Sequence, residues 1–284
     1  MNFTRIEIPK PARFVSTVVE NHQLSSRYFL MVLSKPEGFP DPAPGSFLHM
    51  AVPTSGRFFL RRPFSIFDCN GETITLLIVE KGEGTRILRE LGAGETVDFL
   101  GPLGEAFPLL PGQRILAVAG GVGLAPLYYY QKFVSRTLDK RVCPECYQLV
   151  YGGRSEEDLF LSAIDLADEG SLLATDDGSY GFRGNAAQLA EVELERNPVD
   201  ALFSCGPTPM LKAVADLAVQ AGIAHWVSLE NRMACAVGAC RSCVIPVSAK
   251  EQAGKDVKER YKTVCHDGPV FNANEVIWER LPEP

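Results

Sequence analysis

Four cysteines near the C-terminal end constrain the fold of this chain more than any other sequence feature. Cys235, Cys240 and Cys243 lie in one short loop with the spacing C-x4-C-x2-C, and Cys265 follows after twenty-one intervening residues. This spacing is typical of a plant-type [2Fe–2S] site, whose fourth thiolate comes from a distant segment. The loop is filled with small residues that let backbone amides approach a cluster, namely Ala234, Ala236, Gly238, Ala239 and Ser242. The pattern therefore predicts a one-electron centre.

Zinc and disulfides are the alternative uses of these cysteines. A zinc site usually pairs its ligands as CxxC…CxxC, and this segment contains only one such pair, Cys240 and Cys243. Disulfides require an oxidising compartment, and the N-terminus, Met1–Arg5, lacks the apolar stretch of a secretory signal. A further C-x2-C pair, Cys143 and Cys146, has no second pair near it, and we interpret it as a pair without a function.

Composition narrows the function classes. The 284 residues are 46% hydrophobic and 22% charged, with a formal charge of −7 and no cluster of Lys or Arg. A nucleic-acid role is not expected for such a chain. No apolar run approaches the ~18 residues of a membrane helix. We expect a cytoplasmic protein without a membrane segment.

The sequence predicts three parts, at residues 1–110, 111–227 and 228–284. The first contains short apolar runs between Pro- and Gly-rich turns, which indicates a β-sandwich or a β-barrel. Of the two, we expect an antiparallel, Greek-key β-barrel. Its predicted strands include Phe14–Val19, Tyr28–Val32, Phe58–Phe59 and Ile74–Val79, and one short helix is expected at Thr85–Leu91.

In the second part strands alternate with helices, which indicates a parallel sheet covered on both faces. The expected strands are Arg114–Ala119, Tyr147–Tyr151, Ser171–Ala174 and Ala201–Ser204. The expected helices are Ala125–Leu138, Glu156–Asp165, Asn185–Glu195 and Pro209–Gln220. The third part shows little regular pattern and is organised around its cysteines.

Two short motifs in the first part fit a flavin diphosphate. In Arg62-Pro63-Phe64-Ser65 the arginine can pair with a diphosphate, the apolar residues can pack on a ring, and the hydroxyl can bond a ring nitrogen. A turn with an exposed arginine is the alternative. Gly84 and Thr85 follow at a strand-to-helix turn, where free amides favour negative charge, unless the turn is a plain N-cap.

A glycine-rich turn opens the second part. Gly120, Gly121 and Gly123 follow an apolar strand, and Pro126 stands where a third glycine is usual in a dinucleotide motif. Proline suits the first turn of a helix, so we expect this turn to bind the diphosphate of a nicotinamide nucleotide. A tight strand–helix turn without a ligand is the alternative.

Two further loops lie at the carboxyl edge of the predicted sheet, where open α/β folds bind ligands. Cys205, Gly206 and Pro207 end a strand, and Cys205 is the candidate catalytic residue beside a nicotinamide. A lone cysteine can also be a small buried apolar residue. The loop Thr175–Gly181 either meets the nucleotide or is merely a turn.

In this order the motifs resemble the ferredoxin-reductase family over nearly the whole chain. The C-terminal part of the chain restricts this resemblance to one group within the family. Ser228–Cys235, Gly238–Cys243 and Val264–Phe271 look like the electron-transfer subunits of class 1B dihydroorotate dehydrogenases. Such subunits carry FAD and one [2Fe–2S] cluster, and they connect NAD to an FMN subunit that oxidises dihydroorotate to orotate in pyrimidine biosynthesis.

The resemblance implies roles for individual residues. It places Arg62–Ser65 on FAD, Gly84 and Thr85 on its diphosphate, and the four cysteines on iron. The strand Leu77-Ile78-Val79 is expected to contact FAD as well, although relatives often have an arginine near its end, where this chain has Glu80. The Cys143/Cys146 pair and the long segment between Cys243 and Cys265 also depart from the family.

The carriers dictate the order of electron transfer. A nicotinamide exchanges two electrons as hydride, a [2Fe–2S] cluster takes one, and a flavin between them can do both. The resemblance implies a partner with FMN, assembled with this chain in a heterotetramer, that exchanges electrons with the cluster. The alternatives are an NAD(P)H:ferredoxin oxidoreductase subunit of sulfide-dehydrogenase or transhydrogenase type, and a non-enzymatic zinc module. Arg154 and Ser155 could hold a 2′-phosphate, but the acids Glu156–Asp158 favour NAD over NADP.

Overall fold

The computed structural model describes residues 4–54, 56–136, 146–160, 164, 166, 170–249 and 258–281. Within these residues, no helix is both long and apolar enough to cross a membrane.

The first part of the chain is a closed antiparallel barrel of six strands in the order β1-β2-β5-β4-β3-β6, as the sequence predicts. The strands are β1 Ala12–Gln23, β2 Tyr28–Ser34, β3 Phe47–Met50, β4 Arg62–Cys69, β5 Thr73–Val79 and β6 Thr96–Leu103. Buried and half-buried residues alternate strictly along β2, because successive side chains of a strand point to opposite faces. The helix α1, Glu83–Glu90, follows β5.

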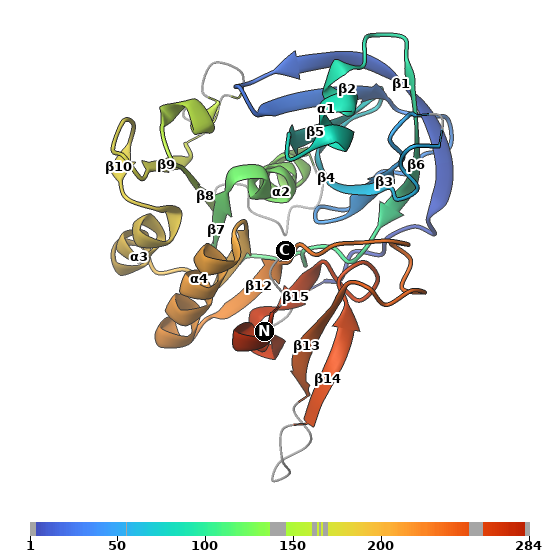
Figure 1. Ribbon diagram of the computed structural model, residues 1–284. Coiled ribbons are helices and arrows are strands. Elements are labelled where there is room, and N and C mark those ends of the chain that lie inside the picture. Colours follow the sequence, from blue (N-terminus) through green and yellow to red (C-terminus); the bar gives the residue numbers. More distant parts are fainter. Residues whose placement is uncertain are drawn as a thin grey trace.

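The second part is a seven-stranded sheet in the order β10-β9-β8-β7-β11-β12-β15. Its strands are β7 Ile115–Gly120, β8 Tyr147–Gly153, β9 Leu172–Thr175, β10 Phe182–Arg183, β11 Ala201–Cys205, β12 Ala224–Ser228 and β15 Val270–Asn272. All neighbours are parallel except β12 and β15. Its helices are α2 Leu124–Arg136, α3 Ala186–Arg196 and α4 Thr208–Ala221. In Figure 1 α3 and α4 lie together on one side of this sheet, while α2 lies toward the barrel.

Helix α2 fastens the sheet to the barrel through three consecutive tyrosines. The ring of Tyr128 stacks on Phe67 of β4 at a centroid distance of 4.6 Å. The hydroxyl of Tyr129 donates to the carbonyl of Pro42 at 2.8 Å, and that of Tyr130 donates to Pro108 at 3.1 Å. Every residue of α2 from Leu124 to Tyr130 is buried, so this part of the helix fills the space between the barrel and the large sheet.

The last part contains more regular structure than the sequence indicates. Strands β13 Val244–Ala249 and β14 Lys258–Thr263 pair as an antiparallel hairpin, which projects from the body in Figure 1. Strand β15 pairs with β12 at the edge of the large sheet. Short 3-10 helices follow at Ala273–Glu275 and Trp278–Arg280. The expectation of little pattern is therefore wrong for this part, although the division of the chain into three parts stays a prediction.

Two predicted elements differ in the structure. Phe58 and Phe59 lie in the loop before β4 rather than in a strand, and Phe59 is 93% exposed. A two-residue apolar run is too short to show the alternation that identifies a strand. The helix expected at 156–165 begins as a 3-10 turn, η3 Glu156–Leu159. Phe160 then has φ +57°, a left-handed conformation that ends the turn. Residues 161–163 and 165 lie outside the described residues.

Candidate functional site

A cavity of about 680 Å³ lies where the barrel, the large sheet and the C-terminal part meet. Its volume is in the range of pockets that hold cofactors. All nine residues predicted to contact FAD line this cavity, together with Cys205. They are Arg62, Pro63, Phe64, Ser65, Leu77, Ile78, Val79, Gly84 and Thr85. The alternative of a turn at Arg62 is wrong, because β4 begins at this residue.

Several further residues line the cavity that the sequence reasoning missed. They include Phe58, Ser228, Glu230, Asn231, Arg232 and Met233. Five of them lie at the end of β12 or directly after it. The neighbouring parallel strand β11 ends at Cys205, and Cys205 is the register partner of Ser228. The rule that ligands bind at the carboxyl ends of parallel strands would have found them, had β12 been recognised as a strand.

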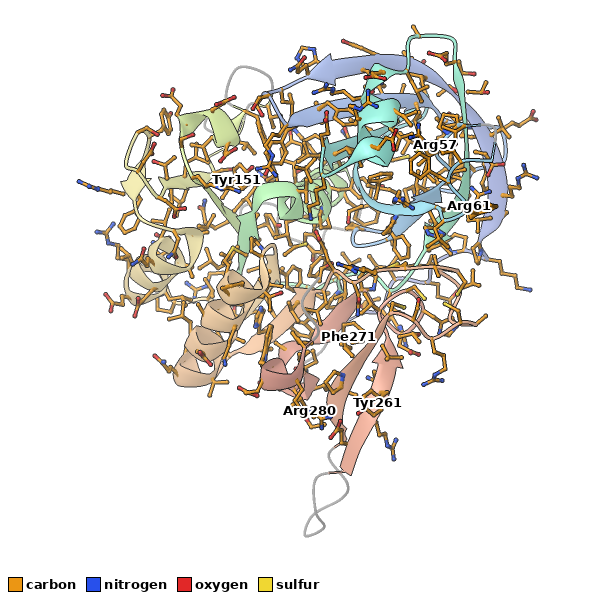
Figure 2. All side chains as sticks on the ribbon, in the orientation of Figure 1. Arg57, Arg61, Tyr151, Tyr261, Phe271 and Arg280 are labelled. Carbon is orange, nitrogen blue, oxygen red and sulfur yellow. The ribbon has the colours of Figure 1, made fainter. Side chains whose placement is uncertain are left out.

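Among the described residues, no carboxylate pairs with the guanidinium of Arg62, in contrast to its neighbours. Arg57 pairs with Glu83 at 2.7 Å, and Arg61 pairs with Asp98. Arg62 donates instead to the carbonyl of Leu60 at 2.7 Å and lies 5.8 Å from the ring centroid of Phe58. Figure 2 shows Arg57 and Arg61 on the barrel side of the molecule. A positive charge in a cavity without a paired carboxylate, among the described residues, fits an anionic ligand.

The turn before α1 is ordered by Thr85. Its hydroxyl accepts from the amides of Lys81 at 3.0 Å and Gly82 at 3.2 Å, and it donates to the carbonyl of Gly82 at 2.9 Å. A Cβ added at Gly84 would lie 3.3 Å from Val52 and 3.7 Å from the Arg62 guanidinium. Gly84 therefore lets the helix N-terminus, which attracts anions, approach Arg62 closely.

Cys205 is a buried neutral thiol at the far end of the cavity. It is 3% exposed. Burial, and then the carboxylate of Glu230, raise the pKa of Cys205 above its ordinary value. A thiol that stays protonated is a poor nucleophile, so the geometry suits packing against a ring rather than covalent catalysis.

The glycine-rich turn packs directly against the segment that begins at Cys205. A Cβ added at Gly123 would lie 2.1 Å from the carbonyl oxygen of Cys205, and one at Gly120 would lie 3.0 Å from Pro207. Gly206 has φ +155° and approaches the backbone of Gly120. Pro126 lies in the first turn of α2, the position that suits a proline. The structure thus brings together the two motifs that the sequence assigns to the nucleotide.

The loops after β8 and β9 are tied to each other at the same sheet edge. The amide of Glu156 donates to the Ser179 hydroxyl at 2.8 Å, and the amide of Asp176 donates to the carbonyl of Gly153 at 3.1 Å. The amide of Arg154 donates to the carboxylate of Asp158 at 3.2 Å. The loop Thr175–Gly181 is therefore fixed against the loop after β8, at the same edge of the sheet as the glycine-rich turn.

The four cysteines predicted to bind iron lie together. Backbone amides donate to three of their sulfur atoms at 3.3–3.4 Å, which links the short loop to the segment around Cys265. The loop contains left-handed residues at Ala236, Gly238 and Arg241. Such a backbone turns its amides inward, and amides that surround a set of sulfurs fit an anionic cluster.

The spacing of the four cysteines fits two irons better than one zinc, because it contains one C-x2-C pair and a distant fourth cysteine. Zinc requires its four ligands around one centre, whereas a [2Fe–2S] cluster distributes four thiolates over two irons. Hydrogen bonds from Ser242 and then Cys235 lower the pKa of Cys240 to about 6, whereas burial raises the pKa of Cys265 to about 12. Bound iron would hold such crowded thiols as thiolates.

Among the described residues, Cys69 and Cys205 belong to other clusters of buried side chains. Cys69 is buried in the barrel core, and Cys143 lies outside the described residues, so the interpretation of the Cys143/Cys146 pair stays a prediction.

Comparisons with known proteins agree with the geometry. Residues 230–277 match the family described as the iron-sulfur cluster binding domain of dihydroorotate dehydrogenase B. The dihydroorotate dehydrogenase B (NAD(+)) electron transfer subunit of Caldanaerobacter subterraneus subsp. tengcongensis is 36% identical over 92% of this chain and 97% of the relative. The same subunit of Bacillus caldolyticus is also 36% identical, with the same coverage.

Solved structures share the fold. The NADH-dependent reduced ferredoxin-NADP oxidoreductase, studied for flavin-based electron bifurcation, is 26% identical with a TM-score of 0.77, and the match covers 93% of this chain and 90% of that chain. A ferredoxin NADP+ reductase from Neisseria gonorrhoeae with bound FAD and NADP is 16% identical with a TM-score of 0.61, and it covers 78% of this chain and 94% of that chain. Because the two electron transfer subunits are 36% identical over 92% of the chain, and residues 230–277 match the iron-sulfur domain, the chain belongs to the family of dihydroorotate dehydrogenase B (NAD(+)) electron transfer subunits.

Proposed function

We propose that this chain conducts electrons between NAD and a catalytic partner subunit by way of FAD and a [2Fe–2S] cluster. A bound flavin accepts two electrons as hydride and releases them singly, as a one-electron cluster requires. The observation that carries the proposal is the continuity of the two sites, because residues 228–233 line the cavity and the cysteine loop starts at residue 235.

Different cavity residues would bind different parts of FAD. The Arg62 guanidinium and the amides at the start of α1 would bind the diphosphate. Because the Thr85 hydroxyl is engaged in the turn, its proposed part is to position those amides. Pro63, Phe64 and the strand Leu77–Val79 would pack on the flavin ring, and the Ser65 hydroxyl would bond one of its heteroatoms.

The nicotinamide half of NAD would enter beside Cys205, and Gly206 would allow the ring to pass close to the backbone. Gly120, Gly121 and Gly123 would receive the diphosphate at the N-terminus of α2, as in other dinucleotide folds. The acids Glu156–Asp158 favour a ribose without a 2′-phosphate, which supports NAD as the nucleotide. Hydride transfer needs no acid or base from the chain, so these residues act by orientation.

The partner proposed for the cluster is an FMN-containing subunit that oxidises dihydroorotate to orotate, assembled with this chain as a heterotetramer. The names of the relatives support this partner, since they describe an electron transfer subunit of dihydroorotate dehydrogenase B. Cluster thiolates are best preserved in a reducing compartment, which supports a cytoplasmic location.

A second candidate is a ferredoxin-linked oxidoreductase subunit, favoured by the likeness to the ferredoxin-NADP oxidoreductase at 26% identity. The higher identity of the dihydroorotate dehydrogenase relatives over the whole chain supports the first candidate instead.

Co-expression with a candidate FMN subunit tests the proposal. We expect a brown complex with flavin absorption bands that forms NADH from NAD when dihydroorotate is added. A complex that instead reduces ferredoxin, and forms no NADH when dihydroorotate is added, would support the second candidate. A colourless protein with zinc and no flavin would exclude both.

A further inference from the structure

The cysteine sulfurs have two kinds of hydrogen-bond partner among the described residues, namely backbone amides and one side-chain hydroxyl. Three sulfurs accept from backbone amides. These bonds run from Cys240 to Cys235 at 3.4 Å, from Cys265 to Cys243 at 3.4 Å, and from Gly238 to Cys265 at 3.3 Å. The sulfur of Cys240 faces a side chain, the Ser242 hydroxyl, at 3.2 Å, in addition to a backbone hydrogen bond with Ser242. Within this set, the bond with the hydroxyl is the one that a side-chain substitution can remove.

The chemistry of the site decides the direction of this bond. Either atom could donate in the free thiol, but a thiolate bound to iron has no proton, so the hydroxyl must donate. Arg241, between the two residues, has φ +57°, which is uncommon for a residue with a side chain. This turn of the backbone brings the Ser242 hydroxyl back toward the sulfur of Cys240.

The position of Cys240 makes the bond relevant to electron exit. Cys240 is exposed, whereas Cys243 and Cys265 are each 1% exposed. A partner that approaches the cluster from solvent therefore meets the Cys240 side first. The residue that hydrogen-bonds this thiolate lies at the point where an electron would leave.

We propose that the Ser242 hydroxyl sets the reduction potential of the cluster by donating a hydrogen bond to the thiolate of Cys240. The proposal rests on the [2Fe–2S] site proposed above. Reduction adds one electron and hence one negative charge to the cluster, with no bond made or broken. A hydrogen bond to a cluster sulfur stabilises the added charge, so the hydroxyl raises the potential and makes the cluster a better acceptor from the flavin. Ser242 is thus a positioning residue that acts through Cys240.

Two substitutions at residue 242 test the proposal. Ser242→Ala removes the hydroxyl, Ser242→Thr keeps it, and Ser135→Ala, in the exposed last turn of α2, is the control. The holoprotein of each is titrated anaerobically with dithionite, and the reduced cluster is counted by its electron paramagnetic resonance signal. We expect a more negative midpoint for Ser242→Ala, a near wild-type midpoint for Ser242→Thr and Ser135→Ala, and an unchanged flavin midpoint in all of them.

Each other outcome contradicts the proposal in a different way. An unchanged midpoint in Ser242→Ala would show that the hydroxyl has no effect on the potential. Equal shifts in the alanine and threonine variants would assign the effect to the shape of the loop. Loss of iron in Ser242→Ala would make the hydroxyl an assembly determinant rather than a tuning group. Absence of iron and sulfide from the wild type would overturn the cluster site itself, and this is measured first.

Discussion

Met233 lines the cavity proposed for FAD, and Cys235, only two residues further along the chain, belongs to the cysteine loop. Two residues of fully extended chain span at most about 7 Å, so the cavity and the loop are held next to each other by the backbone itself. Pro269 forms a second connection, because it lines the cavity and follows Cys265 by four residues. The two proposed redox sites are therefore parts of one continuous structure.

Loss of one cluster ligand should remove iron and spare the flavin. Cys240 is exposed and lies outside the cavity lining, so Cys240→Ser should leave the FAD-binding residues in place while it abolishes the cluster. Iron, sulfide and FAD are assayed per chain in the variant and the wild type. Loss of FAD together with iron would mean that the two sites do not assemble independently.

Removal of the cavity arginine should weaken FAD binding. Arg62→Ala deletes a charge-assisted bond to the diphosphate of about 1.5–3 kcal/mol, which is roughly a tenfold to hundredfold loss of affinity. The dissociation constant of FAD is measured by the recovery of flavin fluorescence. Arg86→Ala is the matched control, because Arg86 lies in α1, two residues after Gly84, but outside the cavity lining, and it pairs with Glu90 at 2.9 Å. Equal losses in both variants would argue against a specific role for Arg62.

A single methyl group should separate the glycine-rich turn from the Cys205 segment. In Gly123→Ala the new Cβ would meet the Cys205 carbonyl oxygen at 2.1 Å, so one of the two segments must move. We expect NADH to reduce the FAD of this variant at least tenfold more slowly, which corresponds to about 1.4 kcal/mol. Photoreduction of the same FAD should be unaffected. Gly71→Ala, whose Cβ would meet nothing within 4 Å, provides the control, and a normal rate in Gly123→Ala would contradict the proposed nucleotide site.

Buried histidine should make the fold sensitive to acid. Burial lowers the pKa of His225 to about 3, and its ring shares a hydrogen bond with the Ser204 hydroxyl at 2.7 Å. Between pH 6.5 and 3 the unfolded chain binds a proton that the folded chain does not. The free energy of unfolding therefore falls as the pH decreases through this window, by up to about 1.4 kcal/mol per pH unit.

The measurement is urea unfolding at pH 7.5 and pH 5.5 in excess FAD. His225→Leu, although less stable, should lose part of this pH dependence, because its side chain cannot bind a proton. His22→Gln, at an exposed position, should keep the wild-type dependence. An unchanged slope in His225→Leu would show that His225 is not the group responsible.

The sequence predicts the local motifs well because each is defined by a residue pattern within one short segment. The barrel strand β2 shows strict alternation, and the turn from β7 to α2 combines an apolar strand with glycines and a proline, so both are found where the sequence predicts them. The cysteine spacing likewise leads to four residues that the structure brings together.

What the sequence does not reveal depends on contacts between distant segments. Strand β12 is short, and only its pairing with β11 and β15 shows that Ser228 and the residues after it reach the cavity. Phe58 lines the cavity while Phe59 beside it is exposed, and no periodicity distinguishes the two. The Ser242 hydroxyl faces a sulfur because Arg241 adopts a left-handed conformation, which no residue-type preference predicts.

The path of electrons is tested most directly by mixing NADH with the Cys240→Ser complex in a stopped-flow instrument. FAD bleaching and reduction of the FMN in the partner subunit are followed separately under anaerobic conditions. The proposed path predicts that FAD is reduced at the wild-type rate while the partner's FMN stays oxidised. Reduction of the partner at the wild-type rate without a cluster would contradict it, because FAD would then transfer electrons to the partner directly and the four cysteines would be structural.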